Sequence, residues 1–378
     1  MITFFSNFIN EHQIPFCEAM YKKTNGGFRF VATEPIDRER LKMGFVDKSE
    51  HFSYVIKSYE NDSSYKMAME LGLSSDVVII GSAPDDFIKE RLDQNKLTFR
   101  YFERFFKEGR IRILDPRVFK AHYKQDFRYR NKNLYMLCAS AYTAPDCRFI
   151  LSYPDKTYKW GYFPETEQLP YDSIAKAKQK ENKVKILWAG RMIDWKHPEA
   201  AIYLSKQLES YNLPFSLDMI GDGEMRSNLE NIVRNENLQD DVSFLGSMPP
   251  DQVRKNMMSA DIFLFTSDRN EGWGAVLNES MSTACAVVAS REIGSVPYLI
   301  EDSKNGLVYN RKDKNSLFNC VKRLIENKSF RETLGKNAYD TIKNLWNAEV
   351  ATDRLLTLIE CINNGTPVPY TTGPCSKD

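Results

Sequence analysis

Two glutamates in the last third of the chain have the spacing of a paired-carboxylate site. Glu271 and Glu279 lie eight positions apart, Gly272 and Gly274 follow the first, and the apolar run DIFLFTS precedes both. Glycines let backbone approach a ligand closely, and free N–H groups at a helix start favour phosphate. Carboxylates beside a phosphate must accept hydrogen bonds from hydroxyl groups, which sugars and ribose supply. For a glutamate pair without such surroundings, the preferred alternative is a capped surface helix with two solvated glutamates. The glycines and the strand favour a binding site.

A second group that could contact phosphate follows an earlier strand. Gly190 ends the run VKILWAG, and Arg191 and Lys196 come next, before a helix that begins near His197. Ligands of parallel sheets bind at the carboxyl ends of the strands. A forked guanidinium and an ammonium together can neutralise a diphosphate leaving group. Taken alone, this segment is better interpreted as two solvated charges.

The residues around both groups alternate between short apolar runs and amphipathic stretches. In the second half, helical patterns separate the expected strands VKILWAG, FSLDMIG, VSFLG, DIFLFTS, CAVVAS and GLVY. This pattern predicts a doubly wound α/β domain. In the first half, MITFF, FRFVAT, DVVIIGS, LTFRY and NLYMLCAS alternate with helices less regularly and predict a second α/β domain.

A polar, lysine-rich stretch separates the two halves. We expect an N-terminal domain over 1–165, a linker over 166–183, a C-terminal domain over 184–345, a helix over 346–362 and a mobile tail over 363–378. Whether the C-terminal helix packs on the N-terminal domain is left open.

Composition narrows the class of protein. The chain has 378 residues, a length that favours two domains. Its formal charge of +1 does not indicate a nucleic acid partner. The sequence contains no uninterrupted apolar run of about 18 to 20 residues, so it predicts no transmembrane helix. The opening MITFFSNFI lacks a basic leader and is interpreted as a strand, and the seven scattered cysteines are expected to be reduced. We therefore expect a cytoplasmic protein, with a peripheral contact at the inner face of the membrane left open.

The segment DIFLFTSDRNEGWGAVLNESMSTACAVVAS resembles the signature of the family-4 glycosyltransferases. That family consists of retaining enzymes with the GT-B fold, in which two Rossmann-like, doubly wound parallel-sheet domains face each other across a cleft. The resemblance implies that Glu271 contacts the donor sugar, the amides of residues 272–275 hold the diphosphate, and Glu279 binds ribose. Arg191 and Lys196, in AGRMIDWKHPEAAI, match the cations that meet the diphosphate.

Weaker matches extend the resemblance to roughly residues 184–310. MIGDGEMRSNLE resembles the family's Gly-Asp-Gly turn, FLGSMPPDQV resembles a loop that contacts the nucleobase, and REIGSVPYLIEDSKNGLVY resembles the last nucleotide-facing segment. Tyr298 departs from the glutamate that members often carry there. The implied catalytic residues are Glu271, Arg191 and Lys196, and the implied donor-binding residues are Gly190, Gly221, Gly223, Ser247, Met248, Gly272, Trp273, Gly274, Ala275 and Glu279.

The resemblance assigns the acceptor to the N-terminal domain. SNFINEHQIPFCEAMY resembles a variant in polysaccharide-assembling members, with a His-Gln-any-Pro element at the first helix. His12 is the leading acceptor-side candidate, and Asn7 and Gln13 follow. An equal alternative is that His12 is a histidine at a helix start whose hydrogen bonds are satisfied within the protein. Glu103 and Arg104 resemble an acidic–basic pair of similar enzymes.

The stretch between residues 100 and 130 interleaves basic and aromatic side chains. Such a face could meet anionic lipid headgroups or a pyrophosphate-linked lipid acceptor. A solvated basic face is the alternative, and the pattern alone favours it.

No Asp-any-Asp triplet, the usual glycosyltransferase ligand for a divalent metal, occurs in the chain. We therefore expect metal-independent transfer of a hexose or related sugar, with no cofactor beside the nucleotide-sugar co-substrate. The resemblance implies retention, a UDP donor by family frequency, and a saccharide or lipid-linked glycan acceptor in bacterial surface polysaccharide assembly. A nucleotide-sugar epimerase of the same fold and a non-catalytic nucleotide-sugar-binding protein stay open. A dinucleotide dehydrogenase is disfavoured because no G-x-G-x-x-G follows a strand.

Overall fold

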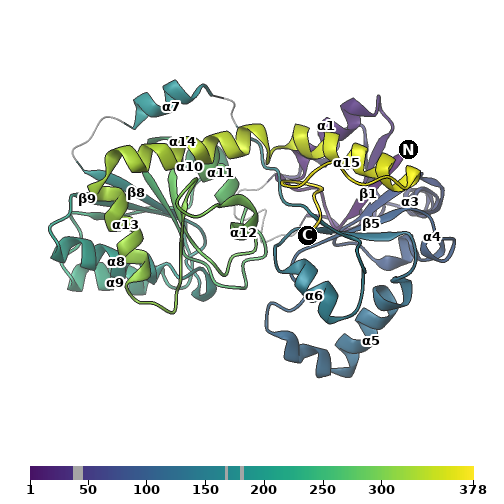
Figure 1. Ribbon diagram of the computed structural model, residues 1–378, viewed down its shortest axis with the longest axis horizontal. Coiled ribbons are helices and arrows are strands. Elements are labelled where there is room, and N and C mark those ends of the chain that lie inside the picture. The colour runs from purple at the N-terminus through teal and green to yellow at the C-terminus, as the bar shows by residue number, and fades with distance from the viewer. Residues whose placement is uncertain (37–45, 167–168, 179–182) are drawn as a thin grey trace. The chain divides into compact units, whose positions relative to one another are not determined.

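The computed structural model describes residues 1–36, 46–166, 169–178 and 183–378 (Figure 1). Over these residues the chain forms two compact units. Unit 1 comprises Met1–Glu165 and Ala348–Asp378, and unit 2 comprises Thr166–Asn347. Each unit is built on its own all-parallel sheet, which confirms the expected α/β class with two Rossmann-like domains.

The sheet of unit 1 has its strands in the order β3-β2-β1-β4-β5-β6-β7. β1 and β4, at the centre, are buried along their whole length, as expected for parallel strands that helices cover on both faces. The strands are β1 (Ile2–Ser6), β2 (Phe28–Ala32), β3 (Val55–Lys57), β4 (Val77–Ile80), β5 (Thr98–Phe102), β6 (Leu134–Cys138) and β7 (Thr157–Lys159).

The helices of unit 1 include one from the far end of the chain. α15 (Ala348–Asn364) lies beside α1 (Ile14–Lys23) in Figure 1, and Lys23 Nζ is 3.0 Å from Glu349 Oε2. This contact assigns α15 to unit 1. The other helices are α3 (Asp62–Ser74), α4 (Lys89–Asp93), α5 (Pro116–Gln125) and α6 (Thr143–Phe149), with 3-10 helices at Ser49–His51, Asp85–Phe87, Arg110–Leu114 and Phe127–Tyr129.

The last residues of the tail over 363–378, which was expected to be mobile, instead pair with the edge strand β7. The backbone N–H of Cys375 donates to the Lys159 carbonyl over 2.8 Å, and the Lys159 N–H donates to the Ser376 carbonyl over 2.9 Å. Cys375 and Ser376 are fully buried. The expectation rested on Gly, Pro and Thr content, which says nothing about the unpaired backbone groups that an edge strand offers. The prediction of a mobile tail was therefore wrong for these residues.

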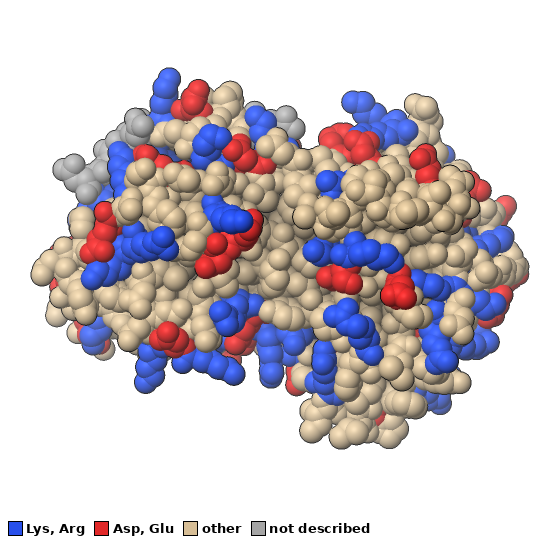
Figure 2. Space-filling view, viewed as in Figure 1, with Lys and Arg blue, Asp and Glu red and all other residues tan. Residues whose placement is uncertain are grey.

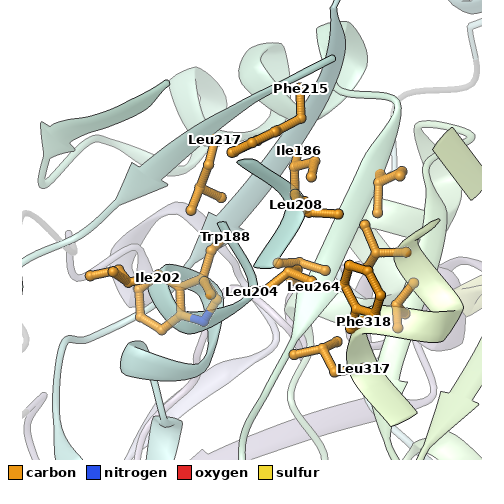
Figure 3. Packing of buried hydrophobic residues seen from close by; sticks show 14 of the residues in the cluster. Ile186, Trp188, Ile202, Leu204, Leu208, Phe215, Leu217, Leu264, Leu317 and Phe318 are labelled. Carbon is orange, nitrogen blue, oxygen red and sulfur yellow. The ribbon is translucent and has the colours of Figure 1, made fainter. Parts of the chain in front are cut away.

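The sheet of unit 2 has the order β10-β9-β8-β11-β12-β13. Its core lies between the sheet and the helices α8, α9 and α13, where Trp188, Leu204 and Leu264 are among the buried side chains (Figure 3). The strands are β8 (Val184–Ala189), β9 (Phe215–Ile220), β10 (Val242–Gly246), β11 (Ile262–Phe265), β12 (Ala286–Ser290) and β13 (Leu307–Tyr309). The helices are α8 (Glu199–Ser210), α9 (Arg226–Asn235), α10 (Pro250–Ser259), α11 (Val276–Ser282), α12 (Val296–Leu299), α13 (Ser316–Glu326) and α14 (Lys328–Asn344), with a 3-10 helix at Asp194–Lys196.

The stretch expected as a linker contains a helix that packs on unit 2. α7 (Tyr171–Ala177) buries Ile174 against Ala284 and Tyr339. Within the same stretch, residues 167–168 and 179–182 lie outside the described residues. A single buried apolar side chain in a lysine-rich helix gives no helical period, so the sequence pattern could not show this packing.

Two expectations concern the chain as a whole. In the part of the chain that the structure describes, no helix is both long and apolar enough to cross a membrane. All seven cysteines are free, as expected, and five of them are buried.

Candidate functional site

The residues singled out in the C-terminal half gather at one edge of the unit 2 sheet. Gly190 follows β8, the turn of residues 221–223 follows β9, residues 247–248 follow β10, and the loop to Glu271 follows β11. These strands are parallel and adjacent, so their carboxyl ends share an edge. Ligands of open α/β sheets bind at this edge.

The turn after β9 requires glycine at two positions. Gly221 has a φ of +127° and Gly223 a φ of +157°, a region that residues with a Cβ rarely adopt. A Cβ atom would lie 1.9 Å from the Gly190 carbonyl oxygen at the first position and 2.5 Å from the Met192 carbonyl oxygen at the second. The turns after β8 and β9 are therefore packed backbone to backbone.

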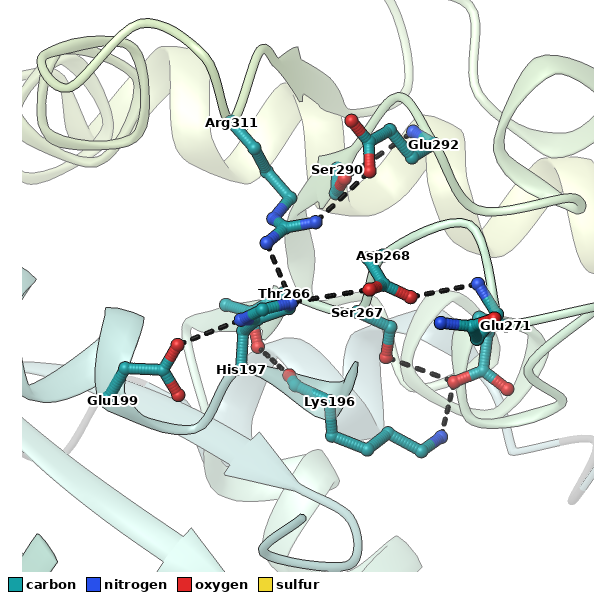
Figure 4. A network of polar contacts seen from close by, with 11 residues as sticks. Lys196, His197, Glu199, Thr266, Ser267, Asp268, Glu271, Ser290, Glu292 and Arg311 are labelled. Atoms are coloured by element: carbon teal, nitrogen blue, oxygen red, sulfur yellow. Dashed lines mark hydrogen bonds and ion pairs between the residues drawn. The ribbon is translucent and has the colours of Figure 1, made fainter. Parts of the chain in front are cut away.

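Lys196 and Glu271 form an ion pair at this edge (Figure 4). The Lys196 ammonium contacts Glu271 Oε2, and Ser267 Oγ donates a 2.9 Å hydrogen bond to the same oxygen. The two charged side chains are only 15% and 10% exposed. Removing either partner would leave the other as a poorly solvated charge. The structure thus brings together two of the three residues predicted to be catalytic.

Hydrogen bonds from the residues after β11 hold the loop that carries Lys196. Thr266 Oγ1 donates to the Lys196 carbonyl over 2.7 Å, and Trp188 Nε1 donates to Thr266 Oγ1 over 2.8 Å. The Asp268 N–H donates to the Trp195 carbonyl over 3.0 Å. Trp188 and Thr266 are buried, so an unmade hydrogen bond here would be costly. The ammonium is therefore presented from a loop that is fixed to the core.

Arg191, the third predicted catalytic residue, lies on the same loop but is exposed. Its guanidinium carbon is 5.9 Å from the centroid of the Trp195 ring, and the Lys196 ammonium is 4.6 Å from that centroid. Both distances are within the range of a cation–π contact. Both cations therefore lie beside the ring of Trp195. In the sequence, the only sign of this role is that Trp195 stands between Arg191 and Lys196.

His197, which follows Lys196, has a left-handed backbone with a φ of 50°. Its Nδ1 lies 2.8 Å from Glu199 Oε1, and its Nε2 lies 2.6 Å from Arg311 Nη2 (Figure 4). A guanidinium only donates, so in this arrangement Nε2 accepts and the Nδ1–H donates to Glu199, which is the hydrogen-bonding pattern of the neutral form. Arg311 also donates to Glu292 Oε2 over 3.0 Å.

We predict that His197 gives the stability of the fold a pH dependence. Burial and the charge of Arg311 lower the pKa of His197, but Glu199 and Asp268 outweigh both effects, so the pKa is raised above its ordinary value of 6.5. A protonated Nε2 would repel Arg311 and turn to Asp268 Oδ2, which is 3.5 Å away. Because the folded-state pKa is raised, the stabilisation is present below about pH 6.5 and is lost as pH rises through the folded-state value.

Chemical denaturation across that pH range tests this prediction. The unfolding free energy of the wild type should fall with rising pH more steeply than that of His197→Gln. The control His51→Gln, at an exposed position of unit 1, should keep the wild-type slope. Equal slopes for wild type and His197→Gln would contradict the assignment.

Trp273 supports the turn after Glu271 from within the core. Its ring is fully buried, with ring centroids 5.8 Å from Trp346 and 6.2 Å from Tyr298. Its Nε1 donates to Asn278 Oδ1 over 2.9 Å. A donor contact by Trp273 would therefore use its backbone rather than its ring. Tyr298, which departs from the family pattern, stacks on Trp346 at 5.9 Å.

The remaining residues of the turn have little freedom. Gly274 has a φ of +78°, and a Cβ atom there would lie 2.2 Å from Cζ of Phe265. Gly272 and Ala275 are buried, and α11 begins immediately afterwards. The backbone of residues 272–275 therefore crosses the end of β11 in a fixed path.

Glu279 lies on α11 and faces Arg254 of α10. Glu279 Oε1 and Arg254 Nη1 are 3.9 Å apart, and the side chains are 14% and 19% exposed. Arg254 Nε is buried and has no hydrogen-bond partner among the described residues. The sequence did not point to Arg254, because its helix shows only a packing pattern. Ser247 is exposed, and Met248 Sδ lies 3.5 Å from Asn256 Nδ2.

In unit 1, two of the five acceptor-side candidates meet on Tyr162. The His12 ring stacks on the Tyr162 ring, with centroids 5.9 Å apart and planes at 9°. The Tyr162 hydroxyl donates to the Glu103 carboxylate, which also lies 2.7 Å from the Lys107 ammonium. Burial raises the pKa of Tyr162 well above its ordinary value, so the phenol stays a donor. No pattern in the sequence signalled Tyr162.

The other three candidates have different surroundings. The Arg104 guanidinium lies 4.7 Å from the Tyr142 ring centroid. The Asn7 carbonyl accepts a 2.9 Å hydrogen bond from the Thr33 N–H, and Gln13 is buried at the start of α1.

The C-terminal half matches a known protein family. Residues 172–341 match the model described as glycosyl transferases group 1. Residues 172–341 belong to the group 1 glycosyl transferases. The recognition based on the Glu271 segment is thereby confirmed.

Curated relatives align with part of the chain. An uncharacterized glycosyltransferase of Methanocaldococcus jannaschii is 33% identical over 132 residues, which are 35% of this chain and 37% of that protein. The N-acetylgalactosamine-N,N'-diacetylbacillosaminyl-diphospho-undecaprenol 4-alpha-N-acetylgalactosaminyltransferase of Campylobacter jejuni is 27% identical over 174 residues, 46% of each chain. The chain spans less than half the length of the curated relatives it matches.

Solved structures share the fold over both units. A glycosyltransferase from Rickettsia africae has a TM-score of 0.67 at 14% identity, with 97% of this chain and 99% of that one covered. HepE of Anabaena, solved in complex with UDP, has a TM-score of 0.70 at 14% identity, with 96% and 99% covered. These likenesses confirm the expected GT-B fold.

Proposed function

We propose that the chain transfers a hexose or related sugar from a nucleotide-diphosphate sugar to a saccharide or lipid-linked glycan. The transfer retains the configuration of the anomeric carbon and needs no metal ion. One observation carries the proposal. In a group 1 glycosyl transferase segment, the largely buried Lys196–Glu271 contact, with Ser267, lies at the ligand-binding edge of the sheet.

The donor binds at the carboxyl edge of the unit 2 sheet. Glu271 accepts hydrogen bonds from the sugar hydroxyls, the amides of residues 272–275 hold the diphosphate, and Glu279 binds ribose. The fixed path of the turn supports this assignment, because preorganised N–H groups lose little freedom when an anion binds. Arg254 restrains the Glu279 carboxylate from the side.

Lys196 and Arg191 stabilise the diphosphate as the glycosidic bond breaks. A cation aimed at charge that develops in the transition state supplies stabilisation that a metal ion would otherwise provide. The bond from the anomeric carbon to the phosphate oxygen breaks while the acceptor oxygen bonds on the same face. The acceptor proton passes to the departing phosphate oxygen, so configuration is retained. Glu271 positions the sugar and forms no covalent bond.

The acceptor binds to unit 1. His12, Tyr162 and Glu103 follow the carboxyl ends of β1, β7 and β5, and their polar groups suit sugar hydroxyls. The printed name of the Campylobacter relative includes a diphospho-undecaprenol-linked glycan, which supports a lipid-linked acceptor in bacterial surface polysaccharide assembly. The reaction then takes place in the cytoplasm, at the inner face of the membrane.

A thermal-shift panel of UDP-, GDP- and ADP-sugars tests the donor site. We expect a UDP-sugar to raise the melting temperature most, since HepE was solved with UDP. At a ligand concentration 100 times Kd, binding stabilises the folded state by about 2.7 kcal/mol. Glu279→Gln should reduce the shift that UDP alone produces. The control Glu236→Gln, which replaces a carboxylate paired with Lys206, should not.

Three outcomes of these assays would contradict parts of the proposal. If no nucleotide sugar shifted the melting temperature, the proposed donor site would be contradicted. Product formation without an acceptor would indicate an epimerase. Binding with neither transfer nor hydrolysis would indicate a nucleotide-sugar-binding protein.

A further inference from the structure

The side chain of Arg311 joins two loops at the carboxyl edge of the unit 2 sheet (Figure 4). Arg311 follows β13, and its Nη1 donates to Oε2 of Glu292, which follows β12, over 3.0 Å. Its Nη2 lies 2.6 Å from Nε2 of His197, on the loop after β8. β11 and β12 lie between β8 and β13 in the sheet. The guanidinium therefore connects loops that two strands separate.

Partial burial distinguishes these contacts from the charge pairs at the surface. On the face of unit 2 that Figure 2 shows, Lys and Arg lie beside Asp and Glu at several places. Exposed pairs of this kind contribute little, because solvent screens them. The side chains of Arg311, Glu292 and His197 are 25%, 30% and 17% exposed. Their contacts are therefore less screened.

The contact with Arg311 helps to hold His197 in an unfavourable backbone conformation. His197 has a φ of 50° and a ψ of 51°, in the left-handed region that residues with a Cβ avoid. Such a conformation persists where the surroundings fix it. Both ring nitrogens have a partner, because Nδ1 lies 2.8 Å from Glu199 Oε1 and Nε2 contacts Arg311. The imidazole is thereby fixed on two sides.

The backbone angle of His197 determines how the peptide group before it is oriented. That peptide contains the Lys196 carbonyl, which accepts the 2.7 Å hydrogen bond from Thr266 Oγ1. Because a peptide group is planar, rotation about φ of His197 would turn this carbonyl away from Thr266. The Lys196 Cα lies in the same plane, so the lysine side chain would move too. The contact between Arg311 and His197 therefore affects where the Lys196 ammonium lies.

The second contact of Arg311 leads to Glu271. Glu292 belongs to the segment after β12, in which the Gly294 N–H donates to the Glu271 carbonyl over 3.3 Å. Ile293, between Glu292 and Gly294, is fully buried. By binding Glu292, the guanidinium restrains the segment that contacts the Glu271 backbone. One arginine is thus connected to both members of the Lys196–Glu271 ion pair.

We infer that Arg311 is a positioning residue for the Lys196–Glu271 ion pair. It joins the loop that carries Lys196 to the segment that holds Glu271, and so keeps the ammonium and the carboxylate in the geometry that transfer needs. The inference rests on the proposed function, in which Lys196 meets the diphosphate and Glu271 meets the sugar.

Charge argues that Arg311 acts through its neighbours rather than by binding the diphosphate itself. Three carboxylates, those of Glu199, Asp268 and Glu292, lie around Arg311 and His197. Three negative charges against one guanidinium leave a formal charge of −2, and a protonated imidazole would still leave −1. Such a cluster repels an anionic ligand. Both terminal nitrogens of Arg311 also have protein partners already.

Steady-state kinetics of Arg311→Met in the full chain test the inference, with the nucleotide sugar that shifts the melting temperature most. At saturating donor, kcat should fall by roughly 10- to 100-fold, as a displacement of about 1 Å in an active site can cause. The KM for the donor should stay within about twofold of the wild-type value, because Arg311 does not contact the donor.

A double-variant cycle tests whether Arg311 acts through His197. His197→Gly should lower kcat by a similar factor, because glycine adopts the left-handed backbone freely but lacks the imidazole. Arg311→Met with His197→Gly should be no slower than the slower single variant, since both changes break the same contact. All rates are measured at a temperature at which every variant is folded.

Arg331→Met is the matched control. The Arg331 side chain is 10% exposed, and its Nε lies 3.9 Å from Asp261 Oδ1, just before β11. This contact is at the amino end of the strand, whereas the candidate site is at the carboxyl end. Arg331→Met should therefore lower the melting temperature and keep kcat.

Three results would overturn the inference while leaving the proposed function standing. The first is a wild-type kcat for Arg311→Met. The second is a double variant whose loss is the product of the two single losses, because Arg311 and His197 would then act separately. The third is a raised donor KM with an unchanged kcat, which would make Arg311 a direct ligand of the donor. A wild type that transfers no sugar would instead overturn the proposed function, and the inference with it.

Discussion

Lys196→Met is expected to lower kcat for sugar transfer by roughly 100- to 1000-fold, because the proposed function assigns this cation to the developing diphosphate charge. The measurement is the initial rate at saturating nucleotide sugar. The same change leaves Glu271, whose side chain is only 10% exposed, without its cation. Breaking such a pair costs about 3–5 kcal/mol of folding free energy, so the melting temperature should also fall.

A second ion pair of unit 2, between β8 and β9, provides the control. Lys185 Nζ lies 3.0 Å from Asp218 Oδ2, with side chains 23% and 17% exposed, and Lys185 is near the start of β8. Lys185→Met should lower stability while kcat is kept. The double variant Lys196→Met, Glu271→Gln should recover part of the stability and none of the activity. A wild-type kcat for Lys196→Met would show that the assigned role is wrong.

Glu271→Gln is expected to lower transfer by roughly 10- to 100-fold at saturating donor. The amide still accepts a hydrogen bond from Ser267, but hydrogen bonds to a charged acceptor are worth about 1.5–3 kcal/mol, more than those to a neutral one. The sugar hydroxyls therefore lose their strongest acceptor, and Lys196 loses its anion. Rates measured over a donor titration separate this loss from weaker donor binding.

The matched change Asp218→Asn should leave the transfer rate unaltered, because its carboxylate pairs with Lys185. If Glu271→Gln transferred sugar as fast as the wild type at saturating donor, its role in positioning the sugar would be refuted.

The strands that the sequence predicted are those with the longest apolar runs. β1, β4 and β11 are buried along their whole length and carry a clear signal. β3 and β7 were not predicted, because each has only three residues and one of them is a lysine, whereas the equally short β13 is the apolar run LVY. So short a strand is defined by hydrogen bonds to its neighbour rather than by its own periodicity.

The candidate site was predictable where local spacing and strand order decide the geometry. Glu271 and Lys196 each follow a parallel strand, and adjacent strands place them at one edge. The pairing of Arg311 with His197 joins positions 114 apart in the chain, and Arg254 reaches Glu279 from another helix. Such contacts depend on the packing of helices and loops, which no spacing of residues in the sequence encodes.

The return of the last residues to unit 1 bears on the order in which the chain can fold during synthesis. Unit 2 is one continuous stretch, so it can close its sheet while the end of the chain is still in the ribosome. Unit 1 must wait for residues 348–378, and until they arrive the edge of β7 is open to pairing with another polypeptide. A chain cut short after Asn347 would therefore combine a completed unit 2 with an aggregation-prone unit 1.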